Sequence, residues 1–124
     1  MNTQQKISVI LSIRSTISCK LSKQVSLLEL DKTEDFVGLN LRNLALNNDD
    51  LSDFNFTDCD LREVDFTGSI LNNTNFTRAN LSGANFDYCK LNYTNFTDAK
   101  LIETQWGNNI TFSNTIFKTT QDIE

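Results

Sequence analysis

Seven carboxylates crowd one stretch of this 124-residue chain, and they are the side chains best suited to chemistry. Only Arg62 opposes them within that stretch, and the seven are Asp49, Asp50, Asp53, Asp58, Asp60, Glu63 and Asp65. Paired carboxylates can act as the acid and base of a glycosidase or hold a hard metal ion. They can also form a negative surface for a basic partner, or a solvated surface that only keeps the protein soluble.

Several absences weigh against catalysis. The chain has no His, which is the commonest general base and a common metal ligand. Its Ser, Thr and Cys residues would need an oriented base to become nucleophiles. No Gly-bearing calcium loop accompanies the acids. We therefore expect no enzyme, no metal and no cofactor, and the acidic cluster is the candidate partner-binding site.

Cysteines and glycosylation sequons add little. The three cysteines, Cys19, Cys59 and Cys89, are too few and too scattered for a disulfide framework, so we expect reduced thiols. Asn-x-Ser/Thr sequons recur, but they follow from the repeated tripeptide Asn-Phe-Thr and are poor evidence of secretion.

A five-residue repeat must position these side chains. Starting at Phe36, every fifth residue is Leu, Phe or Trp for fifteen consecutive positions. If this central residue is i, position i−2 is usually small or apolar, and i−1 is mostly Asn or Asp. Positions i and i−2 share one face of an extended segment. In an α-helix, by contrast, apolar residues spaced five apart would be distributed around the whole circumference and would form no common face. The pattern predicts a coil of short extended segments joined by turns.

The repeats Ala79-Asn80-Leu81-Ser82-Gly83 and Ala84-Asn85-Phe86-Asp87-Tyr88 resemble the signature of the pentapeptide-repeat family. The resemblance covers residues 34–106 and implies an all-β fold, a right-handed quadrilateral parallel β-helix of about four coils. Central residues should then stack at intervals of 20, and like residues do recur at that interval. The expected inward columns are Phe36, Phe56, Phe76 and Phe96; Leu41, Leu61, Leu81 and Leu101; and Phe66, Phe86 and Trp106.

Two departures from the repeat predict local irregularity. Bulky residues occupy i−2 in the early repeats, which predicts a wider or less regular bore there; they are Leu39, Leu44, Phe54 and Val64. After Trp106 one residue is added, so Phe112 and Phe117 come one place late and a bulge is predicted.

We divide the chain into an N-terminal capping segment (1–33), the β-helix (34–119) and a C-terminal tail (120–124). Alternating apolar residues from Lys6 to Leu27 predict two strands with a bend near Arg14 to Thr16. The weaker competitor is an amphipathic helix through Ile7, Ile10, Leu11, Ile17, Leu21, Val25 and Leu28. At the other end, Ile110, Phe112, Ile116 and Phe117 lack cover, which favours a homodimer through that end, as the resemblance also implies.

Charge is divided unevenly along the chain. Residues 1–28 carry four basic residues and no acid, and residues 29–124 carry seven basic and sixteen acidic residues. An ordinary polar cap explains this; a membrane surface, an acidic partner or a second copy are alternative contacts for the basic end. No apolar run approaches the roughly 18 residues of a membrane span, and no convincing cleavage site follows the first apolar stretch. We expect a cytoplasmic bacterial protein, with a secreted effector as the alternative.

Three functions are compatible with the sequence. The first is a non-catalytic protein-protein interaction module or scaffold whose partner is unknown. The second comes from the resemblance: some members of the family mimic duplex DNA, bind DNA gyrase or topoisomerase IV and give quinolone protection. For this chain we expect no direct binding of nucleic acid. The third is a translocated bacterial effector, motivated by the Ser-rich, acid-free N-terminus.

Overall fold

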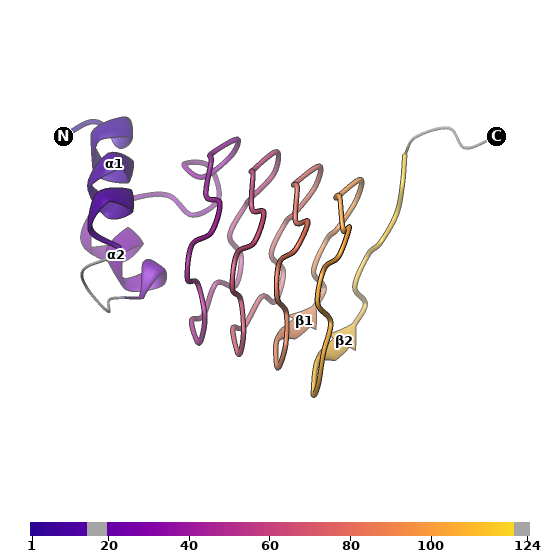
Figure 1. The fold of residues 1–124 in the computed structure, drawn as a ribbon. Helices are drawn as coiled ribbons and strands as arrows, with labels where there is room; N and C mark the ends of the chain where they lie inside the picture. Colours follow the sequence, from indigo (N-terminus) through magenta and orange to yellow (C-terminus); the bar gives the residue numbers. More distant parts are fainter. Residues whose placement is uncertain (15–19, 121–124) are drawn as a thin grey trace.

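The computed structural model describes residues 1–14 and 20–120, and they form a β-helix solenoid (Figure 1). Two helices lie at one end, the coils follow in a row, and residue 120, the last of the described residues, lies toward the other end. The named strands are short, with β1 at Lys90–Asn92 and β2 at Thr111–Ser113. Over the described residues, no helix is both long and apolar enough to cross a bilayer.

Residues that are 20 positions apart in the sequence lie side by side in successive coils. Parallel bridges join Asn40 to Asp60 and Asn55 to Asn75, and the same interval recurs along the solenoid. The N–H of Leu41 donates to the carbonyl of Asp60 at 2.8 Å, and the N–H of Asp60 donates back to the carbonyl of Leu39 at 2.9 Å. Each coil is thus hydrogen-bonded to its neighbours at the stacking interval that the sequence predicts.

A tight turn separates each repeat from the next. The residue at i+2 has a left-handed backbone, as at Asp58 (φ 62°) and Gly83 (φ 75°). Between Leu51 and Thr104, hydrogen bonds close most of the turns, as from the N–H of Cys59 to the carbonyl of Phe56 at 3.1 Å. A positive φ at the third residue is typical of type II turns.

The Asn or Asp at i−1 braces this turn from the side. Asn75 Oδ1 accepts the N–H of Thr77 at 2.9 Å and its hydroxyl at 2.5 Å. Asn95 and Thr97 make the same two bonds one coil later. Because Asn and Asp readily form such bonds with the residue two places later in the chain, the tripeptide Asn-Phe-Thr is a turn-forming pattern.

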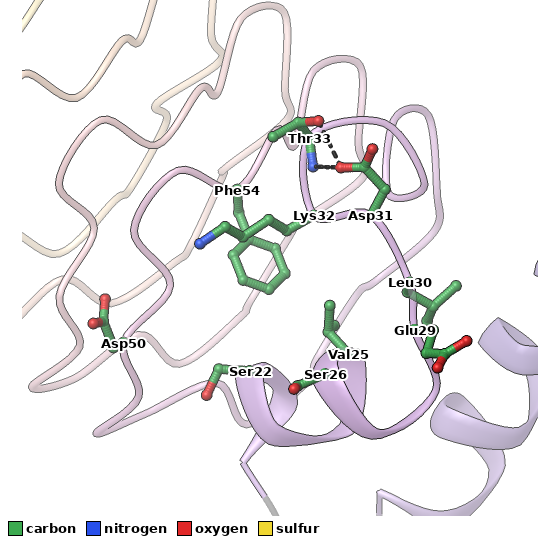
Figure 2. Close-up of a pocket in the computed structure, with 10 residues that line it drawn as sticks. All are labelled: Ser22, Val25, Ser26, Glu29, Leu30, Asp31, Lys32, Thr33, Asp50 and Phe54. Atoms are coloured by element: carbon green, nitrogen blue, oxygen red, sulfur yellow. Dashed lines mark hydrogen bonds between the residues drawn. The ribbon is translucent and has the colours of Figure 1, made fainter.

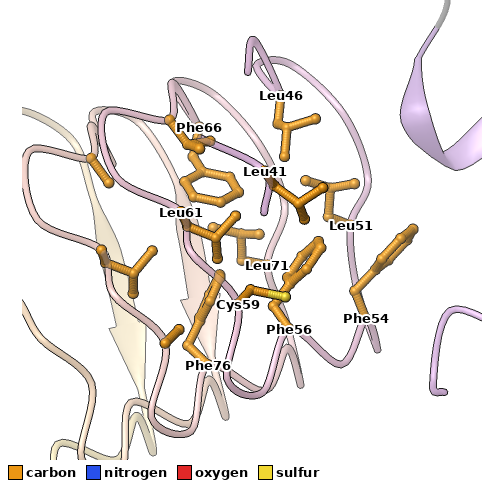
Figure 3. Close-up of a cluster of buried hydrophobic side chains, with 14 of the residues drawn as sticks. Leu41, Leu46, Leu51, Phe54, Phe56, Cys59, Leu61, Phe66, Leu71 and Phe76 are labelled. Carbon is orange, nitrogen blue, oxygen red and sulfur yellow. The ribbon is translucent and has the colours of Figure 1, made fainter. Parts of the chain in front are cut away.

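Stacked side chains fill the interior (Figure 3). The ring centroid of Phe76 lies 5.7 Å from that of Phe56 and 5.2 Å from that of Phe96, with nearly parallel rings. Phe86 meets Phe76 edge-on at 6.0 Å. Leu101 and Trp106 are only partly buried, because little of the chain lies beyond them. The other expected inward residues are buried, namely Phe36, Leu41, Phe56, Leu61, Phe66, Phe76, Leu81, Phe86 and Phe96.

The predicted slip after Trp106 is confirmed. In the pairing of β1 with β2, Lys90 lies opposite Thr111, an offset of 21 residues where earlier bridges have 20. Gly107 stands at the slip, and a Cβ there would lie 1.6 Å from Oδ1 of Asp87. A side chain at Gly107 would therefore force Asp87 to move.

The N-terminal segment is helical, so the predicted strands are wrong and the helical competitor is right for the described parts. Helix α1, Thr3–Ile13, begins with a capping box in which Asn2 and Gln5 accept each other's N–H at 2.8 and 2.9 Å. It buries Ile7 and Ile10, which lie one turn apart, and leaves Val9 37% exposed. The alternation of apolar and polar residues that suggested strands arises because Ser residues occupy the solvent-exposed side of a helix. The expected bend falls partly on Ser15 and Thr16, outside the described residues.

Helix α2, Leu21–Leu27, packs on the first coil. It buries Leu21, Gln24 and Val25, at helical spacing. Leu21 and Val25 belong to the same apolar cluster as the solenoid core, while Leu27 is exposed.

Two N-terminal cations bond to the edge of the first coil. Arg14 donates to the carbonyl of Ala45 at 2.5 Å, and Lys20 Nζ donates to the carbonyl of Asn47 at 3.2 Å. One coil later, the equivalent carbonyls of Asp65 and Thr67 accept N–H groups from the preceding coil. The first coil has no preceding coil on this side, so the cationic side chains supply the missing donors.

Candidate functional site

The acidic cluster lies around one coil of the solenoid. Its members fall in the repeats centred on Leu51, Phe56, Leu61 and Phe66. A step of five residues is a quarter of the 20-residue stacking interval, so these repeats occupy successive parts of the coil. The cluster is therefore a band around the solenoid, whereas the sequence suggested a single patch.

Asp49 does not belong to an accessible surface, and its prediction as a partner-binding residue is wrong. Its side chain is at the inward position i−2 and only 6% exposed. Its carboxylate accepts the N–H of Ser22 at 3.0 Å and the hydroxyl of Ser22 at 2.5 Å, so it fixes α2 to the coil. Asp49 and Ser22 are 27 residues apart, and nothing in the sequence pairs them.

Asp58 and Asp60 are held by arginines. Arg78 Nε donates to Asp58 at 2.8 Å, and this hydrogen bond lowers the pKa of Asp58. Arg62 makes two bonds to Asp60 at 2.9 and 2.7 Å, and Arg42 lies 4.0 Å away. The pKa of Asp60 is lowered chiefly by the bond from Arg62. Both carboxylates remain ionised at neutral pH, which suits neither to be a general acid or base.

Asp50 and Asp65 brace their turns in the way that Asn75 does. Asp50 Oδ1 accepts the N–H of Ser52 at 3.1 Å, and Asp65 Oδ1 accepts the N–H of Thr67 at 2.9 Å. Hydrogen bonds from the side chain and N–H of Ser52 lower the pKa of Asp50. The two aspartates are therefore equivalent in their local bonding, although they lie in different parts of the coil.

Within the acidic cluster, Asp53 and Glu63 are the exposed residues with the fewest bonds to their surroundings. Asp53 lies 3.9 Å from Lys32 Nζ, with more than half of its side chain exposed. Glu63 passes beside Gly83, where an added Cβ would lie 2.3 Å from its Oε1. Both residues occupy i+2, at a corner of the coil, where a partner could reach them.

Buried hydroxyl and thiol groups at i−2 are bonded to the backbone. Ser69 donates to the carbonyl of Leu46 at 2.6 Å, and Cys59 donates to that of Phe36 at 2.8 Å. Burial raises the pKa of Cys59 to about 11 and that of Cys89 to about 12. Because only the thiolate is a good nucleophile or metal ligand, both thiols are inert core groups. Over residues 1–14 and 20–120, no cluster of His, Cys, Asp and Glu could hold a metal ion.

The C-terminal end of the stack presents an apolar surface. Phe112, Ile116 and Phe117 are 47%, 44% and 51% exposed. Phe117 continues the aromatic column, with its ring 5.0 Å from that of Phe96, and it meets Trp106 edge-on at 5.7 Å. The structure thus leaves Phe112, Ile116 and Phe117 exposed, as the sequence predicted, whereas Ile110 is partly buried and packs against the core.

A family model described as pentapeptide repeats matches 8 copies in this chain, over residues 40–78, 59–98 and 79–105. Among solved structures, the chain resembles a pentapeptide repeat protein, Rfr23, from the cyanobacterium Cyanothece 51142, with a TM-score of 0.50 and 28% identity. The match covers 64% of this chain and 61% of that protein, so the chain spans only part of the relative's length. No curated protein gives a significant match.

Two further solved structures match less well. One is a pentapeptide repeat protein from the thylakoid lumen of Arabidopsis thaliana, with 21% identity, a TM-score of 0.41, and coverage of 64% of this chain and 59% of that one. The other is HetL from Nostoc sp. strain PCC 7120, which is involved in heterocyst differentiation regulation. It has 20% identity, a TM-score of 0.41, and coverage of 66% of this chain and 43% of that one.

Proposed function

This chain belongs to the pentapeptide repeat family, and we propose that it is a non-catalytic protein-protein interaction module or scaffold. The observation that carries the proposal is how the potentially reactive side chains are used. Ser69, Cys59 and Cys89 donate to buried carbonyls. Asp50 and Asp65 accept hydrogen bonds within their turns, and Asp58 and Asp60 pair with arginines. What the protein offers to its surroundings is a regular outer surface and one apolar end.

The acidic band is the proposed contact for a basic partner, through Asp50, Asp53, Asp58, Asp60, Glu63 and Asp65. Affinity capture from the source organism tests it with the pair Asp53→Asn and Glu63→Gln, which removes the charges least involved in internal bonds. Glu103→Gln, at the same repeat position in a later coil, is the matched control. We expect the band variant to lose a partner that the wild type and Glu103→Gln both retain. Equal recovery by all three proteins would remove the band from the proposal.

We also propose a homodimer through the C-terminal end. Its support is the exposed apolar surface of Phe112, Ile116 and Phe117 beside the partly buried Trp106. Sedimentation equilibrium should show a dimer for the wild type and a monomer for Phe112→Ser with Phe117→Ser. Val37→Ser is the control, because Val37 is 41% exposed but lies in the first repeat, at the other end of the stack. A wild-type monomer at micromolar concentration would contradict the dimer.

For the architecture we propose a right-handed quadrilateral β-helix of about four coils, with residues 1–33 as its N-terminal cap. The 20-residue stacking interval supports four repeats per coil. The bonds from Arg14 and Lys20 to first-coil carbonyls support the cap. A crystal structure tests both, and a coil of three repeats or a detached N-terminal segment would contradict the proposal.

A further inference from the structure

One side of the solenoid changes its charge from end to end. It consists of the repeats centred on Leu51 and Leu71, followed by β1 and β2, and we call it the β1 side (Figure 1). Its outward residues at i−1 form a column, in which parallel bridges join Asp50 to Ile70 and Ile70 to Lys90. An acid and a base thus lie one coil before and one coil after Ile70.

The N-terminal end of the β1 side is acidic. Four carboxylates and one ammonium group lie on or beside its first coil, next to a hollow that separates α2 from the solenoid (Figure 2). These charged residues are Glu29, Asp31, Lys32, Asp50 and Asp53. The single ammonium group, of Lys32, cannot neutralise all four acids, so this end attracts a positive charge.

Lys90 carries the only charge on the rest of the β1 side. No other charged residue occurs in 68–73, 88–93 or 108–114, which make up the later repeats of this side and their corners. Lys90 is exposed, and the ion pairs of the described residues do not include it. Its ammonium group is therefore accessible to a carboxylate of another molecule.

Ile70, between the two charges, is an exception in the repeat. From residue 35 to residue 105, the other i−1 positions carry Asp, Asn, Lys, Gln or Ala. Ile70 faces outward, is only partly buried, and has no oxygen with which to brace its turn. It places an apolar group at the centre of the column.

Two tyrosines stand at the corners on either side of β1. Tyr88 and Tyr93 occupy i+2 with φ 62° and 57°, and they are 52% and 60% exposed. A left-handed backbone is strained for a bulky residue, and here burial does not offset the strain. Such strain is found where a site uses the residue, and Tyr is enriched at protein interfaces. The tyrosines therefore mark the β1 side as a contact surface.

We propose that the β1 side binds the β1 side of a second copy, with the two solenoids antiparallel and a two-fold axis at Ile70. This arrangement brings Asp50 of each copy opposite Lys90 of the other, and Ile70 opposite Ile70. A parallel arrangement would place Asp50 opposite Asp50, and like charges in contact are unfavourable. The order of charges in the column thus selects the antiparallel pair.

This contact is separate from the proposed C-terminal dimer. One side of a short stack is a small surface, and interfaces below about 1,200 Å² are weak and transient. Sedimentation at micromolar concentration, which tests the C-terminal dimer, should therefore not detect it. A covalent trap detects the contact whether or not the C-terminal dimer exists.

Disulfide trapping with oxidised glutathione tests the axis. In the full chain with Cys19→Ser, which removes another thiol, Ile70→Cys should give a disulfide-linked dimer on denaturing electrophoresis. Asn92→Cys is the matched control, because Asn92 lies on the same side, is also partly buried, and leaves both charges in place. Its two copies would lie about 10 Å apart across the axis, too far for a disulfide, whose Cβ atoms are about 4 Å apart.

Charge reversal tests the pairing. In the Ile70→Cys protein, either Asp50→Lys or Lys90→Glu should slow linkage about fivefold at low salt, through the loss of exposed ion pairs. The two reversals together should restore it. Three results would overturn the proposal: equal linkage of Ile70→Cys and Asn92→Cys, no linkage of Ile70→Cys, or a double reversal that links no faster than the single ones.

Discussion

Phe76 illustrates what a single inward residue contributes. Its side chain is fully buried between the rings of Phe56 and Phe96. We expect Phe76→Ala to lower the free energy of unfolding by about 3 to 5 kcal/mol, through lost transfer energy and the cavity left behind. Urea denaturation measures the loss.

Thr77→Ala is the neighbouring control, because it points outward from the next position. It removes one hydroxyl bond to Asn75 but leaves the N–H bond in place. The expected loss is about 1 kcal/mol, the net worth of one hydrogen bond. Similar losses for the two variants would contradict the assignment of inward and outward positions.

The backbone at i+2 gives a second test at single residues. Gly38 has φ 75°, and a Cβ added there would meet no atom within 4 Å. Gly38→Ala should therefore cost about 1 kcal/mol from backbone strain alone. Tyr93 has φ 57° and is 60% exposed, so Tyr93→Gly should raise the unfolding midpoint in urea. The same sign for both substitutions would show that the turn conformation does not limit stability.

At the scale of elements, the contact between α2 and the first coil depends on Asp49. Asp49→Ala leaves the N–H and hydroxyl of Ser22 without their acceptor, at a cost of about 1 to 3 kcal/mol. Coils bond mainly to their neighbours, so the effect should remain local. Hydrogen exchange should become faster in residues 21–28 and stay unchanged around Phe76. Asp53→Ala, close in sequence but exposed, should change neither region.

Carboxylates at the corners of successive coils make the stability of the protein depend on pH. Arg78 lowers the pKa of Asp58, and hydrogen bonds from Thr120 lower that of Asp98. A carboxylate whose pKa is lower in the folded state stabilises fully above its unfolded pKa, near 3.8, and loses that effect as pH falls through the folded value. The urea midpoint should thus fall on acidification below about pH 4. Asp58→Asn should reduce that fall, and an unchanged fall would contradict the pairing.

Elements differ in how far the sequence could predict them. The solenoid was predictable because each inward residue repeats a local pattern, and the displaced Phe112 and Phe117 revealed the slip. The helices are only the weaker prediction because alternation and helical spacing coexist in residues 6–27. The capping pair Asn2 and Gln5 is the local signal that favours a helix at the start of this segment. The role of Asp49 depends on where α2 packs, a contact between distant parts of the chain that no local pattern encodes.

At the scale of the whole molecule, the question is whether the solenoid could imitate duplex DNA. DNA carries one negative charge per roughly 1.7 Å, and coils stack at about 4.8 Å, so a mimic needs about three negative charges per coil. The coil from residue 66 to residue 86 carries a single charged residue, Arg78, and its charge is positive. A dimer through the C-terminal end would lengthen the rod without filling this gap.

We therefore expect purified protein to leave DNA gyrase supercoiling unchanged at micromolar concentration, with no protection against a quinolone. The variant that carries Asn72→Asp, Asn80→Asp and Asn85→Asp supplies acid to the coil that has none, and it serves as the comparison. If charge continuity is what the wild type lacks, only this variant should inhibit supercoiling. Inhibition by the wild type, lost on neutralising Asp53 and Glu63, would instead show that one acidic band is sufficient and would identify gyrase as the basic partner.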